Sequence, residues 1–359
     1  MTLESHISYK KYSWFLVGMV FLVILAGGVV RMTQSGMGCP DWPRCFGMWI
    51  PPTDASQLPE DFEKYLSKQD IDHSFNVYHT WIEYINRLLG AILGMFIFAY
   101  ALWSSLKFST RRPRMKTSLL VNFGLAAVSV VLLLLGSYNI AKATIILFVL
   151  SAIYSLFHAL RYARRRDIVL PSILLLFAVA IQGWLGKIVV DENLSVVKIT
   201  THMIGALVIA IIPIISIARL SHKIKVSKSL LYTTVGMIVL VFLQIVLGTQ
   251  VREEIDVISK SLAYDNRELW IDRLGYAFII HRSFSWLILA GGIYLVYISR
   301  KMKQMTTGAM ITLVGILLII SLGVIMAYLN MPALAQPLHL LFACALLIQL
   351  VYLRMRIEN

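Results

Sequence analysis

Charged residues are scarce in this sequence. Only 14% of its 359 residues are Asp, Glu, Lys or Arg, whereas 58% are hydrophobic and the mean hydropathy is +0.75. A chain with so few charges cannot cover itself with a water-compatible surface, which excludes an ordinary soluble globular protein. The composition therefore indicates a polytopic membrane protein.

Long apolar runs fill most of the chain. A bilayer core about 30 Å thick requires roughly 20 apolar residues for each spanning helix. No small-residue cleavage pattern follows the first run, so we expect a retained helix and not a removed signal peptide. Ten segments satisfy the length requirement, near residues 12–31, 77–105, 117–138, 142–160, 168–190, 198–218, 230–250, 274–298, 307–328 and 334–353.

The net charge of +14 raises the question of a nucleic-acid partner, and the placement of the basic residues argues against one. Most of them lie in alternate loops, which the positive-inside rule assigns to the cytoplasmic side. Both termini are then cytoplasmic, and the long loops 32–76 and 251–273 lie on the outer face. The basic loops are near residues 10–11, 107–116, 161–166, 219–228, 300–303 and 354–356.

Two parts of the sequence resemble each other weakly and in the same order. Asn86 and His202 are 116 positions apart in the sequence, whereas His281 and His339 are 58 positions apart. A hairpin of two extra helices at about 117–160 accounts for most of this difference. We therefore predict an all-α transmembrane bundle of two pseudo-symmetric four-helix units, 1–218 and 219–359, plus this inserted hairpin. The matching positions are Val30-Arg31 with Val251-Arg252, Asn86-Arg87 with His281-Arg282, and His202 with His339.

Four positions inside the predicted membrane segments matter most for chemistry: His202, His281, His339 and Asn86. At 1.5 Å per residue, we expect them all at one depth, roughly 5 to 15 Å below the outer surface. Imidazoles on facing helices of a four-helix bundle are typical ligands of heme iron in membrane cytochromes. The alternative is that each histidine forms a hydrogen bond with a neighbouring helix. The matching positions of His281 and His339 favour ligation for these two, and His202 is a third candidate.

Glu83 is the acidic residue nearest to this depth. It lies three residues before Asn86, so both side chains lie on one face of the helix. A carboxylate there could accept or deliver a proton during oxygen chemistry. The alternative is a structural ion pair with Arg87 at i, i+4. No acid precedes His281 at the same spacing, which predicts that one half reacts and the other only binds.

Basic residues mark the outer ends of several predicted helices. Arg31 and Arg252 occupy matching positions, and Lys187 and Arg282 lie near the same level. Heme propionates are anions that need a cation when partly buried, so these side chains are candidate partners for them. Interface anchors that keep their charged ends in water are the alternative.

With these residues and the segments IEYINR, QGWLGK and CPDWPRC, the sequence resembles the heme A synthase family, membrane enzymes that oxidise heme O. The resemblance covers residues 12–105 and 168–353. It implies eight membrane helices in two four-helix halves, with heme b as a cofactor in the C-terminal half and heme O as the substrate in the N-terminal half. The hairpin departs from this pattern, because we count ten helices.

The resemblance also implies roles for individual residues. Asn86 stands where many members have a histidine, so we expect an open coordination position on the substrate iron; another residue, such as His79, is the alternative ligand. The remaining assignments are His281 and His339 as ligands of the heme b iron, His202 as a ligand of the substrate iron, Glu83 as the catalytic glutamate, and Arg31 and Arg252 as cofactor-binding residues.

The implied reaction converts the C8 methyl group of heme O to a formyl group by two successive hydroxylations and loss of water, with O2 or water as the oxygen source. The electrons must come from an unidentified donor, because the sequence has no flavin or nicotinamide fingerprint. By resemblance we expect heme O synthase and cytochrome oxidase assembly as partners, a bacterial-type cytoplasmic (inner) membrane as the location, and compatibility with a homo-oligomer.

Cysteine is rare, with three residues in the chain. Cys39 and Cys45 lie in the proline-containing loop GMGCPDWPRCFG and match the outer-loop cysteine pair of the family. A disulfide can persist on the outer face. Two roles stay open: a structural staple that closes a short loop, and a redox-active pair beside the substrate site.

Two functions of other classes also fit parts of the sequence. A di-heme b-type electron-transfer protein explains the histidines without Glu83 or the cysteines. A transporter built from parallel repeats explains the duplication without heme.

Overall fold

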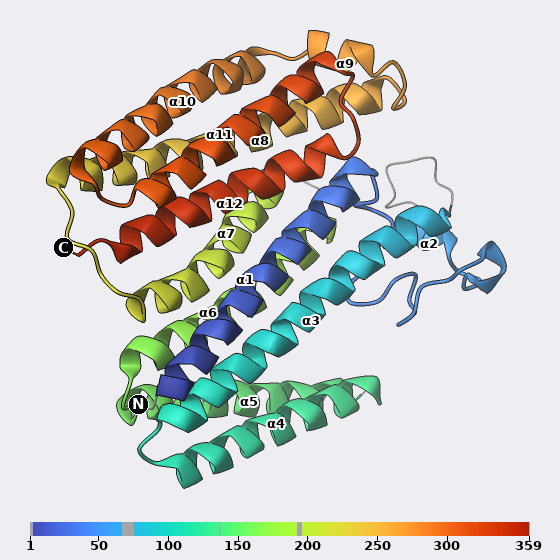
Figure 1. Cartoon of the computed structure of the whole chain (residues 1–359). Helices are drawn as coiled ribbons and strands as arrows, with labels where there is room; N and C mark the ends of the chain where they lie inside the picture. Colours follow the sequence, from blue (N-terminus) through green and yellow to red (C-terminus); the bar gives the residue numbers. More distant parts are fainter. Residues whose placement is uncertain (1–2, 67–74, 136, 192–195, 359) are drawn as a thin grey trace. The chain divides into compact units, whose positions relative to one another are not determined.

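The computed structural model describes residues 3–66, 75–135, 137–191 and 196–358. These residues form helices and connecting loops, with no strand among them (Figure 1). Every predicted membrane segment overlaps a helix, which confirms the all-α fold class. The segment predicted at 117–138 extends past the end of α4 at Leu134, and its residue 136 lies outside the described residues. The long helices are α1 (Leu3–Met32), α3 (Val77–Phe108), α4 (Arg112–Leu134), α5 (Tyr138–Arg161), α6 (Arg166–Asp191), α7 (Val196–Arg219), α8 (Lys228–Ser261), α10 (Tyr276–Met302), α11 (Thr306–Tyr328) and α12 (Ala335–Arg356).

Nine helices in the described part of the chain are long and apolar enough to cross a membrane. The protein is therefore a multi-pass membrane protein, in which each helix satisfies its own backbone hydrogen bonds away from water. These nine do not include α4, which forms a helix at the third predicted segment. The tenth span stays a prediction.

The predicted outer loop at 251–273 is mostly helical, which corrects our boundary at residue 250. α8 continues to Ser261, and the short helix α9 (Glu268–Asp272) follows. The polar residues after position 250 end the apolar run, but they do not end the helix. Arg252 and Asp256 consequently project from an ordered helix.

One compact unit comprises residues 1–93 and 180–359. Within it, α8, α10, α11 and α12 form a closed ring, because α10 packs against α8 and α11 while α12 packs against α11 and α8. α12 also packs against α1 and α7, which pack against each other. This unit holds all the predicted site residues. The division of the chain into halves at residue 218 stays a prediction.

The second unit spans residues 94–179 and contains α4 and α5, which pack against each other. Polar side chains join the two helices: Asn122 donates to Oγ of Ser155 at 2.6 Å, and Ser129 donates to Oγ1 of Thr144 at 2.9 Å. Such bonds associate helices in lipid, where the hydrophobic effect gives no attraction between them. The predicted hairpin at about 117–160 is therefore confirmed as a hairpin.

Candidate heme-binding site

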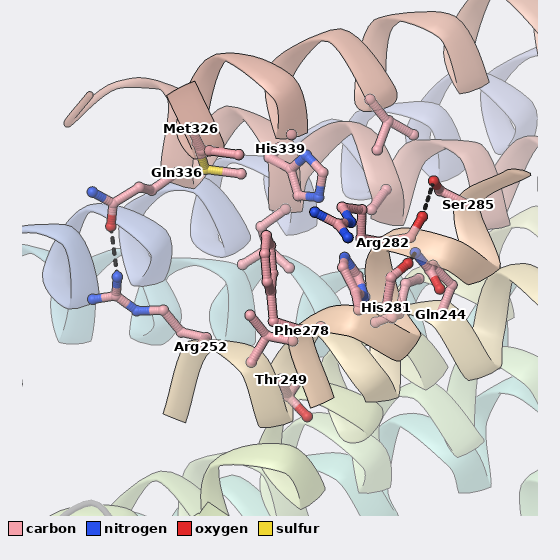
Figure 2. A pocket seen from close by; sticks show the side chains of 18 of the residues that line it. Gln244, Thr249, Arg252, Phe278, His281, Arg282, Ser285, Met326, Gln336 and His339 are labelled. Atoms are coloured by element: carbon pink, nitrogen blue, oxygen red, sulfur yellow. Dashed lines mark hydrogen bonds between the residues drawn. The ribbon is translucent and has the colours of Figure 1, made fainter. Parts of the chain in front are cut away.

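Two histidines face a cavity among the C-terminal helices. His281 lies five residues after the start of α10, and His339 lies four residues after the start of α12. Figure 2 shows both rings directed into the cavity, whose volume is about 290 Å³. The ring centroids are 6.4 Å apart. A metal bound about 2 Å from one nitrogen of each ring requires nearly this separation.

The rest of the cavity also fits a heme. Its wall is mainly apolar, which suits the flat macrocycle. The Nδ1 atoms of His281 and His339 are buried without a hydrogen-bond partner among the described residues, so these nitrogens do not tie the rings elsewhere. The apolar wall includes Val241, Ile245, Ile288, Ile316, Ile320, Leu340 and Leu346.

Each of these histidines faces a glycine on a neighbouring helix. A Cβ atom added to Gly248 of α8 would lie 3.1 Å from Cε1 of His281. One added to Gly323 of α11 would lie 3.5 Å from Cε1 of His339. A larger side chain than alanine at either position would displace the ring, so the two glycines help to set where the imidazoles lie.

The same arrangement occurs in the N-terminal half. A Cβ atom added to Gly186 of α6 would lie 3.4 Å from Cε1 of His202, and one added to Gly27 of α1 would lie 3.9 Å from Oδ1 of Asn86. Glycine and histidine are 16 residues apart both in α6–α7 and in α11–α12. These contacts agree with the repeat in the sequence, and they place Asn86 where the other half has His281.

Two glutamines attach the histidine-bearing helices to their neighbours. Nε2 of Gln244 donates to the backbone oxygen of His281 at 2.9 Å, and Nε2 of Gln182 donates to that of His202 at 2.7 Å. Sequence reasoning missed both residues. An amide side chain inside an apolar segment was the available signal, because such groups usually bond to another helix.

Arg31 and Arg252 line the same cavity as the histidine pair. Arg31 contacts Asp256 at 2.5 Å, and Arg252 contacts the other carboxylate oxygen at 2.9 Å. Arg252 also donates to Oε1 of Gln336 at 2.6 Å, as Figure 2 shows, and to the backbone oxygen of Arg31 at 3.0 Å. The carboxylate of Asp256 thus pairs with two guanidinium groups, so these three side chains together carry one positive charge in excess.

Glu83 is 4% exposed, and both carboxylate oxygens have partners. Oε2 accepts from the backbone N–H of Cys39 at 2.7 Å, and Oε1 accepts from Nε of Arg87 at 3.0 Å. Arg87 also donates to the backbone oxygens of Cys39 at 2.6 Å and Asp41 at 2.5 Å. The structural ion pair that the sequence offered as an alternative is therefore present, and it holds the cysteine loop on α3. A catalytic role of Glu83 stays a prediction.

The start of α3 makes further bonds to the same loop. Nδ1 of His79, the alternative iron ligand, lies 2.9 Å from Oγ of Ser35. The hydroxyl of Thr80 donates to the backbone oxygen of Gly38 at 3.0 Å. The first two turns of α3 thus serve mainly to attach the loop.

Cys39 and Cys45 form a disulfide, and both are fully buried. They pack with Phe46 and partly buried neighbours such as Tyr84. Asp41, inside the loop, accepts from the backbone N–H of Phe46 at 2.6 Å. The disulfide is therefore part of a packed cluster, and a redox role for it stays a prediction.

Comparisons with known proteins point to one family. The COX15-CtaA model, described as cytochrome oxidase assembly protein, matches residues 10–132 and 139–351. This match includes most of the α4–α5 hairpin, which our interpretation of the sequence places outside the resemblance.

Three curated relatives named heme A synthase are similar over shorter stretches. The identities are 33% over 109 residues for the protein of Nitrosospira multiformis, 33% over 90 residues for that of Shewanella oneidensis, and 29% over 107 residues for that of Parvibaculum lavamentivorans. The stretches cover 28%, 24% and 26% of this chain and 30%, 26% and 30% of the relatives, so each match spans less than a third of the relative. The family model, in contrast, matches most of the chain, which therefore belongs to the COX15-CtaA family of cytochrome oxidase assembly proteins.

Proposed function

We propose that this protein is a heme A synthase, which oxidises the C8 methyl group of heme O to a formyl group during cytochrome oxidase assembly. The observation that carries the proposal is the pair His281 and His339, whose rings face each other across a cavity at a separation suited to heme iron. The similarity to proteins named heme A synthase supports the same reaction.

In this proposal His281 and His339 hold heme b as a resident cofactor. Bound heme b supplies one-electron redox chemistry. The apolar wall keeps water away from it, and the excess positive charge of Arg31 and Arg252 over Asp256 attracts its propionates.

Heme O is the substrate of the N-terminal half, with His202 as a ligand of its iron. Asn86 is a poor iron ligand, so one face of the substrate stays open for oxygen. Glu83 exchanges protons near the reacting edge. The N–H of Cys39 donates to Oε2 of Glu83, and protonation of Glu83 weakens this bond, because a neutral carboxyl group is a poorer acceptor than a carboxylate. Proton transfer at Glu83 is thus coupled to the position of the cysteine loop.

The reaction proceeds by two hydroxylations and loss of water from the resulting gem-diol, with O2 or water as the oxygen source. With O2 as the source, each hydroxylation takes two electrons from a donor outside the chain and releases one water molecule. With water as the source, each hydroxylation instead passes two electrons to an acceptor outside the chain. Heme O comes from a heme O synthase. We place the protein in a bacterial-type inner membrane. Both termini are in the cytoplasm, because the positive-inside rule assigns the loops rich in Lys and Arg to that side.

The test is expression of the full chain in cells that make heme O but no heme A, followed by heme extraction and mass spectrometry. We expect heme A, or heme O with one added hydroxyl group, in cells with the wild-type chain. In cells with His202→Ala, expressed at the same level, the extract should contain heme O without heme A or hydroxylated heme O. If the extract from cells with the wild-type chain also contained only heme O, the proposal would be contradicted.

A further inference from the structure

Arg282 is a cation directed into the cavity without an anionic partner. It follows His281 in α10 and lines the same cavity as His281 and His339 (Figure 2). Its contact is with the ring of Phe278, whose centroid lies 5.6 Å from Cζ. Among the described residues, no carboxylate lies within 4.0 Å of this guanidinium.

The repeat gives Arg282 a counterpart that does have a partner. The equivalent residue in α3 is Arg87, and four residues before it stands Glu83. These two side chains form an ion pair, and Arg87 uses further N–H groups on loop carbonyls. Four residues before Arg282 stands Phe278, which can offer only the face of its ring. The C-terminal half thus has the arginine without the acid.

The charges along the cavity wall do not balance. The wall contains Arg31, Arg252 and Arg282, and Asp256 pairs with the first two. Among the described residues, this wall therefore has three guanidinium groups for one ion-paired carboxylate, and Arg282 is the one without a carboxylate within 4.0 Å. A cation within a membrane-spanning helix is costly unless an anion or water faces it. A ligand that carries two carboxylates would balance the wall.

We propose that Arg282 binds a carboxylate of the ligand held between His281 and His339. Phe278 has no carboxylate, so it leaves the guanidinium group of Arg282 without an ion-pair partner in the protein and available for the ligand. The inference rests on the proposed heme b site, where the two carboxylates are the propionates. A guanidinium group matches a carboxylate with two parallel N–H bonds. Arg282 thereby selects tetrapyrroles with free carboxylates over uncharged derivatives.

The test compares ferric protoporphyrin IX with its dimethyl ester, which has the same macrocycle and no carboxylate. Full-length protein purified from heme-starved cells is titrated with each, and Soret absorbance gives two dissociation constants. Each charge-assisted contact contributes roughly a factor of ten, so the wild-type protein should prefer the free acid by about 100-fold. Arg282→Gln should lower this preference about tenfold and keep the low-spin spectrum, because both histidines remain.

Phe278 provides a matched pair of variants. Phe278→Glu recreates the ion pair of α3 and should lower the preference as Arg282→Gln does, whereas Phe278→Leu should retain it. An unchanged preference in both Arg282→Gln and Phe278→Glu would overturn the inference and leave the heme site intact. If the wild-type protein does not bind ferric protoporphyrin IX with a low-spin spectrum, the proposed heme b site is wrong as well.

Discussion

The two halves of the predicted repeat carry different side chains at matching positions. Where α10 has His281, α3 has Asn86, and each faces a glycine of the preceding long helix of its half. Where α10 has Phe278, α3 has Glu83. In the proposed function, the C-terminal half therefore holds its ligand from both faces, and the N-terminal half leaves one face of its ligand open beside a carboxylate. This is the difference expected between a site that binds and a site that reacts.

The segments next to the two sites differ in whether their contacts depend on protonation. In the C-terminal half, Val251, Ile255, Trp270 and Met331 form an apolar cluster at the end of α8. In the N-terminal half, the cysteine loop is attached by hydrogen bonds to the Glu83 carboxylate and from Arg87. The apolar cluster is insensitive to protonation, whereas the bonds of the loop depend on the charge of Glu83.

Loss of an imidazole ligand in the C-terminal half should have the largest effect. In His339→Ala only His281 remains as a ligand, so the heme b content of the purified protein should fall at least about tenfold. Free imidazole should restore part of the low-spin spectrum, because it fits the space left by the side chain. Gln349→Ala, in the same helix but outside the cavity wall, should keep its heme. An unchanged heme content in His339→Ala would remove the distinction between the halves.

Glu83→Gln tests the acid that only the N-terminal half has. If the carboxylate exchanges protons with the substrate, heme A formation should fall about 100-fold or more. The variant also breaks a buried ion pair, so a second variant must separate the two effects. Arg87→Met breaks the same pair and keeps the carboxylate. Equal losses of heme A and of folded protein in both variants would show that Glu83 acts only through the loop.

Asn86→His makes the two halves alike at the ligand position. A second imidazole should close the open face of the substrate iron, so heme A formation should fall about tenfold while a new low-spin signal appears with heme O. Mass spectrometry of extracted heme and optical spectra of the purified protein measure the two changes. Faster heme A formation in this variant would refute the assigned role of Asn86.

The smallest effect is expected from the disulfide. In the loop-entropy model, closing residues 39–45 stabilises the protein by about 2 kcal/mol. Cys39→Ala with Cys45→Ala should therefore lower the unfolding temperature, yet heme A formation should fall no more than about threefold, because Glu83 and Arg87 hold backbone atoms that the variant keeps. Complete loss of heme A at normal protein levels would instead favour a redox-active pair.

The sequence predicted the helices and the histidine pair, because apolar runs and repeated positions are local signals. It did not predict that α8 continues through Arg252 and Asp256, since charged residues after an apolar run are typical of a loop. The two ion pairs of Asp256, with Arg31 and with Arg252, depend on this continuation of the helix.

Of the two contacts of Glu83, the sequence predicted one. Its pairing with Arg87 follows from the i, i+4 spacing. Its bond to the N–H of Cys39 joins residues 44 positions apart, and no local pattern encodes it. Similarly, Gln244 and Gln182 were visible as polar residues in apolar helices, but only the structure identifies their acceptors.

The most direct test of the division between the halves compares His202→Ala with His281→Ala in purified full-length protein, using optical spectra and mass spectrometry of the extracted heme. We expect that His202→Ala keeps heme b with a low-spin spectrum and forms no heme A, whereas His281→Ala loses heme b. Loss of heme b in His202→Ala together with its retention in His281→Ala would contradict the account.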